Sequence, residues 1–152
     1  MKSSQARHGI VAIACALVAF VPPAGAGGTA QIDPCSVLTA DQVKTALGVD
    51  VAPGAPISKS SCNWKAKTGR GSATVTLQSG DSWAKMKAMP LAPPKPVSGV
   101  GDDAFIETFG KFSSLGVKKG NTVFIVKVYG VDDVAKQEAI ETALAKNVAA
   151  KL

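Results

Sequence analysis

Residues 104–129 read AFIETFGKFSSLGVKKGNTVFIVKVY, and this stretch decides the fold. It holds three strand-like runs, at 104–109, 112–118 and 122–129, separated by a Gly-Lys and a Gly-Asn turn signal. Three runs with such short connections predict a β-meander. The last run is apolar at almost every position, as expected for an interior strand covered on both faces.

The residues before this stretch predict two more strands. One strand opens at 62–65, and a turn at 68–71 leads to a second at 73–78. The second run alternates apolar and polar residues, which is the pattern of a half-buried antiparallel strand.

Three helices are predicted around these strands. The first covers 39–47, where a Thr and a Gln three residues later form a capping box. The second covers 81–89, is capped by Asp81 and ends at a proline. The third begins at Asp132 or Asp133 and is expected to turn an apolar face to the sheet, formed by Ile140, Ala143, Leu144 and Val148.

The resulting order, α-β-β-α-β-β-β-α, predicts an α+β fold. We expect an antiparallel sheet of about five strands with the helices packed on it. Residues 50–60 and 91–101 are rich in proline and glycine and are predicted to be loops.

The N-terminus has the three parts of a secretory signal. Lys2 and Arg7 precede an apolar run at 10–21, which is too short to span a bilayer, and small residues follow at 24–26. We therefore predict a signal peptide at 1–26 and a mature α+β domain at 27–152, with 27–34 as a leader, exported to the periplasm or secreted. No transmembrane segment is predicted in the mature chain.

The cysteine count fits an exported protein. Cys15 lies in the predicted signal, and a role as a lipoprotein cysteine is disfavoured because only five apolar residues precede it. Cys35 and Cys62 remain, and two cysteines in an oxidising compartment usually pair. We expect one disulfide, which would stabilise the fold by roughly 3 kcal/mol. Free thiols or a metal-binding pair are the alternatives.

Composition argues against several function classes. The mature chain would carry a net charge of about +4 with its lysines spread along the sequence, which does not favour nucleic-acid binding. The one histidine, His8, lies in the predicted signal, so imidazole-based nucleophile activation and the usual zinc sites are not expected. No catalytic residue, metal site or cofactor is predicted.

Several segments resemble exported bacterial proteins grouped as domain of unknown function 3558. They are DPCSVLTA at 33–40, ALG at 46–48, CNW at 62–64, VSGVGDDAF at 97–105 and GVKKG at 116–120. The resemblance covers most of the mature chain. It implies an envelope-located, disulfide-containing domain, often a lipoprotein, with no established activity to transfer.

Two groups of residues are candidates for a functional site. The first is a set of carboxylates, Asp102, Asp103 and Glu107, which could bind a cation or act as an acid–base pair, although turn hydrogen bonds are the favoured explanation for them. The second is the loop from 89 to 101, because long loops in compact domains are often functional, although a role as a plain connector explains it equally well. Its candidate contact residues are Pro90, Leu91, Pro93, Pro94, Lys95 and Pro96.

The sequence favours a non-enzymatic binding domain over an enzyme. Its partner would be an envelope protein, a polymer or a lipid surface, contacted through the proline-rich loop. The alternatives are a small secreted hydrolase or carbohydrate-active enzyme that uses the loop carboxylates, and a secreted protease inhibitor.

Overall fold

A computed structural model describes residues 32–152. The predicted signal peptide at 1–26, including His8 and Cys15, and most of the leader at 27–34 lie outside the described residues. Within 32–152, no helix combines the length and the apolar character needed to cross a membrane.

Residues 32–152 form three helices and one seven-stranded antiparallel sheet, which confirms the α+β class. The elements are α1 (Ala40–Leu47), β1 (Ala55–Ser58), β2 (Ser61–Lys65), β3 (Ser72–Ser79), α2 (Ser82–Ala88), β4 (Lys95–Pro96), β5 (Asp103–Phe109), β6 (Phe112–Lys119), β7 (Thr122–Tyr129) and α3 (Val134–Ala149). The strand order in the sheet is β1-β2-β3-β7-β6-β5-β4.

The sheet has two strands more than expected. β1 and β4 lie in segments that the sequence predicts to be loops, 50–60 and 91–101. Both are short edge strands and each contains a proline, Pro56 or Pro96. Proline has no N–H to donate to a strand ladder, so within sheets it is tolerated mainly in edge strands. Because proline is also typical of loops, the sequence pattern predicts a loop at both places.

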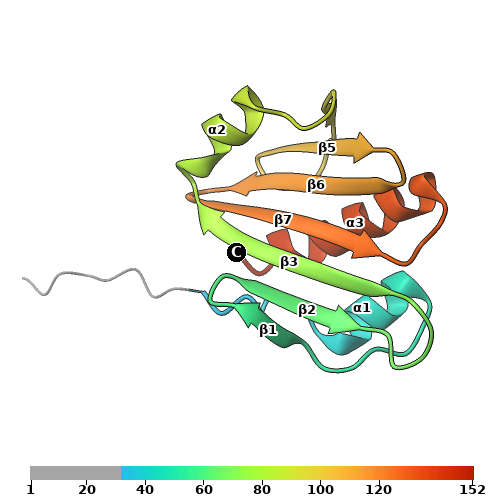
Figure 1. Cartoon of the computed structure of the whole chain (residues 1–152). Helices are drawn as coiled ribbons and strands as arrows, with labels where there is room; N and C mark the ends of the chain where they lie inside the picture. The colour runs from blue at the N-terminus through green and yellow to red at the C-terminus, as the bar shows by residue number, and fades with distance from the viewer. Residues whose placement is uncertain (1–31) are drawn as a thin grey trace, which may run out of the picture. The chain divides into compact units, whose positions relative to one another are not determined.

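Two groups of sequential strands meet in the middle of the sheet (Figure 1). β1, β2 and β3 form one group, and β4 to β7 form the other. The groups join through β3 and β7, whose register runs from Ser72 opposite Tyr129 to Ser79 opposite Thr122. The predicted meander at 104–129 is therefore β5-β6-β7, and its last strand is interior. The expected cover on both faces is only partial, because Val123 packs with Trp83 of α2 whereas Tyr129 is 40% exposed.

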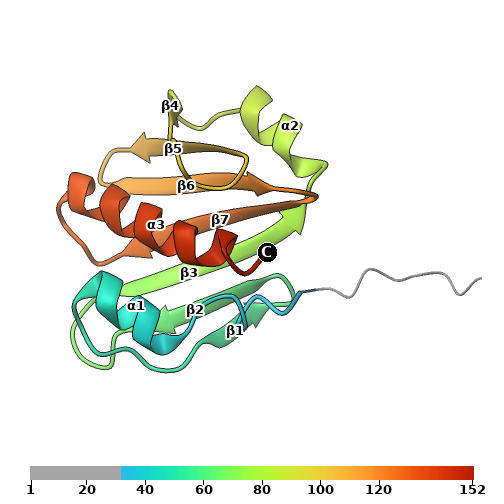
Figure 2. The ribbon, with the colours of Figure 1, turned by 180° about the vertical axis from the view of Figure 1, so that it is seen from behind.

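Helices α1 and α3 cover one face of the sheet (Figure 2). The main core lies beneath them, because alternate residues of each strand point to this face. Its fully buried members include Trp64, Val75, Leu115, Phe124 and Leu144.

The inner face of α3 differs in part from the prediction. Ile140, Leu144 and Val148 are buried as expected, whereas Ala143 is exposed and Ala145 is buried instead. Two polar residues, Gln137 and Glu141, also lie on the buried side. The helix is capped by the second of the two predicted aspartates, since Asp133 Oδ1 accepts a hydrogen bond from Lys136 N–H at 2.8 Å.

The predicted disulfide between Cys35 and Cys62 is present, with the two Cα atoms 5.1 Å apart. It ties the segment that enters α1 to β2. The capping box at the start of α1 is also present. Thr39 N–H donates to the Gln42 side chain, and Gln42 N–H donates to the Thr39 hydroxyl.

The cap predicted for α2 is wrong. The Asp81 side chain makes no capping hydrogen bond, and Asp81 itself already has helical backbone angles. The Ser82 hydroxyl donates instead to the Ser79 carbonyl at 2.7 Å, which ties the start of α2 to the end of β3.

Candidate functional site

The sheet face opposite α1 and α3, which we call the open face, is largely free of helices (Figure 1). α2 covers one part of it, where Trp83 and Met86 pack on Phe105 and Val123. Over β2 and β3 the open face carries amide and hydroxyl groups that bond to one another, as in the 2.8 Å contact from Asn63 Nδ2 to Thr74 Oγ1.

A groove of about 390 Å³ lies at the end of this face near the β5–β6 turn. We call it the aromatic groove, and it is lined by Leu91, Glu107, Phe109, Phe112, Ser113, Ser114, Lys127 and Tyr129. The side chains of Phe109, Phe112 and Tyr129 are 70%, 59% and 40% exposed. Exposed apolar side chains that gather at one place mark an interaction site more often than scattered ones do.

The aromatic side chains of the groove come from three neighbouring strands. Phe109 and Phe112 flank the two-residue turn and are directly opposite each other on β5 and β6. Tyr129 ends β7, and its ring centroid lies 6.5 Å from that of Phe112 at an interplanar angle of 58°. A ring or an alkyl group of a ligand would therefore find aromatic surface on more than one side.

The groove lies where β6 and β7 stop pairing. Their ladder runs from Lys119 opposite Thr122 to Leu115 opposite Val126 and then ends, although both strands continue. In an antiparallel ladder every second pair exchanges hydrogen bonds, so Ser113 and Val128 would form the next bonded pair.

Two side chains of α3 occupy the place of that missing pair, and we call them the polar clamp. Gln137 Oε1 accepts from Ser113 N–H at 3.1 Å, and Gln137 Nε2 donates to the Val128 carbonyl. Glu141 Oε1 accepts from Val128 N–H at 3.0 Å. The Gln137 amide thus acts as a peptide unit inserted between the two strands, and it satisfies backbone groups that would otherwise be buried without partners.

Glu141 has a carboxyl group whose pKa is raised far above its usual value. Its side chain is fully buried, and Oε2 has no hydrogen-bond partner. Burial raises the pKa of Glu141 to about 7, against the opposing effects of the Ser113 hydroxyl and the Val128 N–H. The Ser113 hydroxyl is buried too, and although it lies near enough to the carboxyl to lower its pKa, the two groups do not meet in hydrogen-bond geometry.

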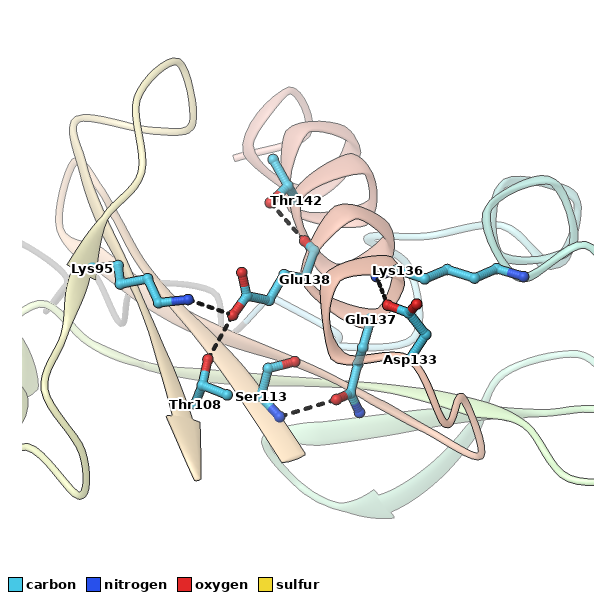
Figure 3. A network of polar contacts seen from close by, with 8 residues as sticks. All are labelled: Lys95, Thr108, Ser113, Asp133, Lys136, Gln137, Glu138 and Thr142. Carbon is cyan, nitrogen blue, oxygen red and sulfur yellow. Dashed lines mark hydrogen bonds and ion pairs between the residues drawn. The ribbon is translucent and has the colours of Figure 1, made fainter. Parts of the chain in front are cut away.

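The proline-rich loop contributes one wall of the groove. Leu91 is 81% exposed, and its N–H donates to Glu107 Oε1 at 2.9 Å. Farther along, Lys95 Nζ contacts Glu138 Oε1 at 3.0 Å, and the same oxygen accepts from Thr108 Oγ1 at 2.6 Å (Figure 3). The loop is therefore attached both to β5 and to α3.

The rest of the predicted contact loop does not enter the aromatic groove. Lys95 and Pro96 form β4 against β5, while Pro90, Pro94 and Pro96 line a separate hollow of about 150 Å³ beside Asp103. Pro93 lines neither of these two sites. Of the six predicted loop residues, Leu91 alone lines the aromatic groove.

The predicted carboxylates are divided among three separate contacts. Asp102 Oδ2 accepts from Gly120 N–H at 2.6 Å, and that bond, with Lys119 nearby, lowers its pKa. Asp103 Oδ2 accepts from Lys87 Nζ at 2.8 Å and from Trp83 Nε1 at 3.1 Å, and these contacts lower its pKa. Both carboxylates fasten elements together, and only Glu107 lines the aromatic groove.

A metal centre is not visible in the described part of the chain. Among residues 32–152, no group of three His, Cys, Asp or Glu side chains is placed to hold a metal ion.

The exposed rings of the groove and the two residues of the polar clamp carry no signal of a site in the sequence. The sequence predicts strands at Phe109, Phe112 and Tyr129 and nothing more, although strand alternation puts Phe109 on one face with Phe105 and Glu107. Gln137 and Glu141 gave no signal, because polar residues of an amphipathic helix are expected to face solvent.

Comparison with known proteins adds no relative. No protein-family model matches the chain, and no curated protein is similar to it.

Proposed function

We propose that the protein is an exported, non-enzymatic binding domain and that the aromatic groove is its ligand site. The observation that supports this most is the gathering of three exposed aromatic side chains, Phe109, Phe112 and Tyr129, around a groove of about 390 Å³. This volume lies in the range of small-molecule sites, roughly 300–1,000 Å³.

The chemistry of the lining favours a small amphipathic anion as the ligand. The aromatic side chains and Leu91 suit a ring or a short alkyl group. Among residues 32–152, Lys127 forms no ion pair, whereas the Glu107 carboxylate already accepts from Leu91 N–H. An anionic group beside Lys127 would therefore give this lysine the ion pair that it lacks among the described residues, while Glu107 keeps its contact with Leu91.

Export and the absence of catalysis are parts of the same proposal. The disulfide supports an oxidising compartment, since such bonds are rare in the cytosol. It also joins the DPC and CNW segments on which the resemblance to domain of unknown function 3558 rests. A hydrolase based on Asp102 and Asp103 has less support, because their contacts with Gly120, Lys87 and Trp83 favour a structural role.

Titration with anilinonaphthalene sulfonate, a fluorescent aromatic anion, tests the groove directly. We expect saturable binding at one site, weakened at least about fivefold by Phe112→Ala, since truncation of a central aromatic contact typically costs more than about 1 kcal/mol. Ile57→Ala is the matched control, because Ile57 is 65% exposed on β1, at the far edge of the sheet, and should leave binding unchanged.

The charge preference needs a second pair of variants. Lys127→Gln should weaken binding of the dye, whereas Lys65→Gln, an exposed lysine of β2, should not. Equal losses in both variants would contradict the assignment of the anion to Lys127. Binding to anionic vesicles in preference to the soluble dye would identify a lipid surface as the partner instead, and failure to bind either would count against the groove.

A further inference from the structure

The polar clamp connects the groove to the interior of the molecule. Gln137 and Glu141 hold the backbone of Ser113 and Val128, and these residues directly adjoin Phe112 and Tyr129 in the chain. The two rings are thus attached to the two backbone segments that the clamp keeps apart. Ser113 itself belongs to the groove lining.

We propose that Gln137 and Glu141 are positioning residues, which set the spacing of Phe112 and Tyr129 and couple the shape of the aromatic groove to the charge on the Glu141 carboxyl. The proposal rests on the proposed function of the groove. Its basis is geometric: both residues replace the one pair of ladder bonds that would otherwise close β6 on β7 where the groove lies.

The groups around Glu141 determine the pH at which its carboxyl gains a charge. The charged groups that act on it are Glu138 on α3, which raises its pKa, and Lys127 on β7, which lowers it. The buried residues of α1, which also packs on α3, are the apolar Val43 and Leu47. No cation among these residues contacts the carboxyl, so burial dominates and the pKa is about 7.

Ionisation should loosen the clamp. The neutral carboxyl can remain buried, whereas the ionised one places a charge in the core with Oε2 unpartnered. The strand ends would then open to admit water, and Phe112 and Tyr129 would lose their fixed spacing. The groove should therefore be well formed below pH 7 and less ordered above it.

Amide NMR of the oxidised protein across a pH titration measures this coupling without any ligand. The Ser113 and Val128 resonances report on the clamp, and those of Phe112 and Tyr129 report on the groove. We expect all four to shift with a common midpoint near the Glu141 pKa of about 7, and this transition to disappear in Glu141→Gln. Shifts limited to Ser113 and Val128, or a transition that persists in Glu141→Gln, would overturn the proposal.

Two milder variants keep the test valid if Glu141→Gln does not fold. Ser113→Ala removes a hydroxyl that lowers the pKa of Glu141 and should raise the midpoint, whereas Glu138→Gln removes a charge that raises it and should lower the midpoint. Midpoints that move together, or not at all, would show that another group titrates.

Dye binding separates this proposal from the proposed function. Affinity for anilinonaphthalene sulfonate should fall at least about fivefold between about pH 6 and about pH 8 in the wild type and stay constant in Glu141→Gln. Coupled NMR shifts without dye binding at any pH would support the clamp and contradict the ligand class. Dye binding that is independent of pH in the wild type would contradict the coupling between Glu141 and the groove and leave the proposed function intact.

Discussion

The two faces of the sheet use the same strands in opposite ways. Beneath α1 and α3, the apolar side chains are buried and the polar exceptions, Gln137 and Glu141, bond to backbone. On the open face, the strands expose hydroxyl groups and a cluster of aromatic rings. The exposed rings of the aromatic groove, Phe109, Phe112 and Tyr129, are therefore expected to add little to folding and to act in binding.

The largest expected effect on stability comes from a comparison of two phenylalanines that lie on opposite faces of the sheet. Phe124→Ala on the helix-covered face should lower the free energy of unfolding by about 3–5 kcal/mol, because it leaves a cavity at a fully buried position. Phe112→Ala on the open face should change it by less than about 0.5 kcal/mol. Urea denaturation of both variants measures this, and similar losses would remove the distinction between the faces.

Reduction of the disulfide tests how firmly α1 is held to the helix-covered face. Opening a loop with a sequence separation of 27 should cost roughly 3 kcal/mol, since the cross-link restricts the unfolded chain. Denaturation with and without a reductant gives the value. An unchanged midpoint would mean that packing of α1 alone fixes this segment.

The pH dependence of stability isolates Glu141. Its pKa is raised from 4.5 to about 7 on folding, so between these values the folded protein retains a proton that the unfolded chain releases. Stability from this group is therefore complete below about pH 4.5, falls by about 3 kcal/mol as pH rises to about 7, and is constant above. The difference between wild type and Glu141→Gln, measured by denaturation at several pH values, should show this curve. A flat difference would contradict the raised pKa.

The smallest effect concerns the attachment of the loop to α3. Lys95→Gln removes an ion pair whose lysine is 62% exposed, while Thr108 still donates to Glu138. Such pairs contribute little, so stability should change by less than about 1 kcal/mol. Lys146→Gln, a lysine of α3 outside the ion pairs of residues 32–152, is the matched control, and a much larger loss in Lys95→Gln would make the loop part of the core structure.

Much of the fold could be predicted because its signals are local. Alternation along β3, the turn signals of the meander and the capping box of α1 each act within a few residues. β1 and β4 could not be predicted in the same way, since their pairing depends on neighbours distant in sequence and their prolines resemble loop residues.

The site depends on contacts that sequence patterns do not contain. The role of Gln137 and Glu141 depends on where α3 packs, because their partners, the backbone groups of Ser113 and Val128, belong to two strands of the sheet. A sequence pattern within the helix does not contain this contact. Leu91 and Glu107 are candidates from the sequence on separate grounds, one in the proline-rich loop and the other among the carboxylates, and the structure brings them together at the groove.

The pairing of β3 with β7 has a consequence for how the chain folds. The residues of this ladder are separated by about 50 positions, whereas β5, β6 and β7 are linked by turns of two residues. Local hairpins form in microseconds and distant pairings form later, so each strand group can assemble before the two join. A chain that folds as it emerges in sequence order would present β3 with an unpaired edge until β7 arrives, and an unpaired edge strand is open to pairing with another chain.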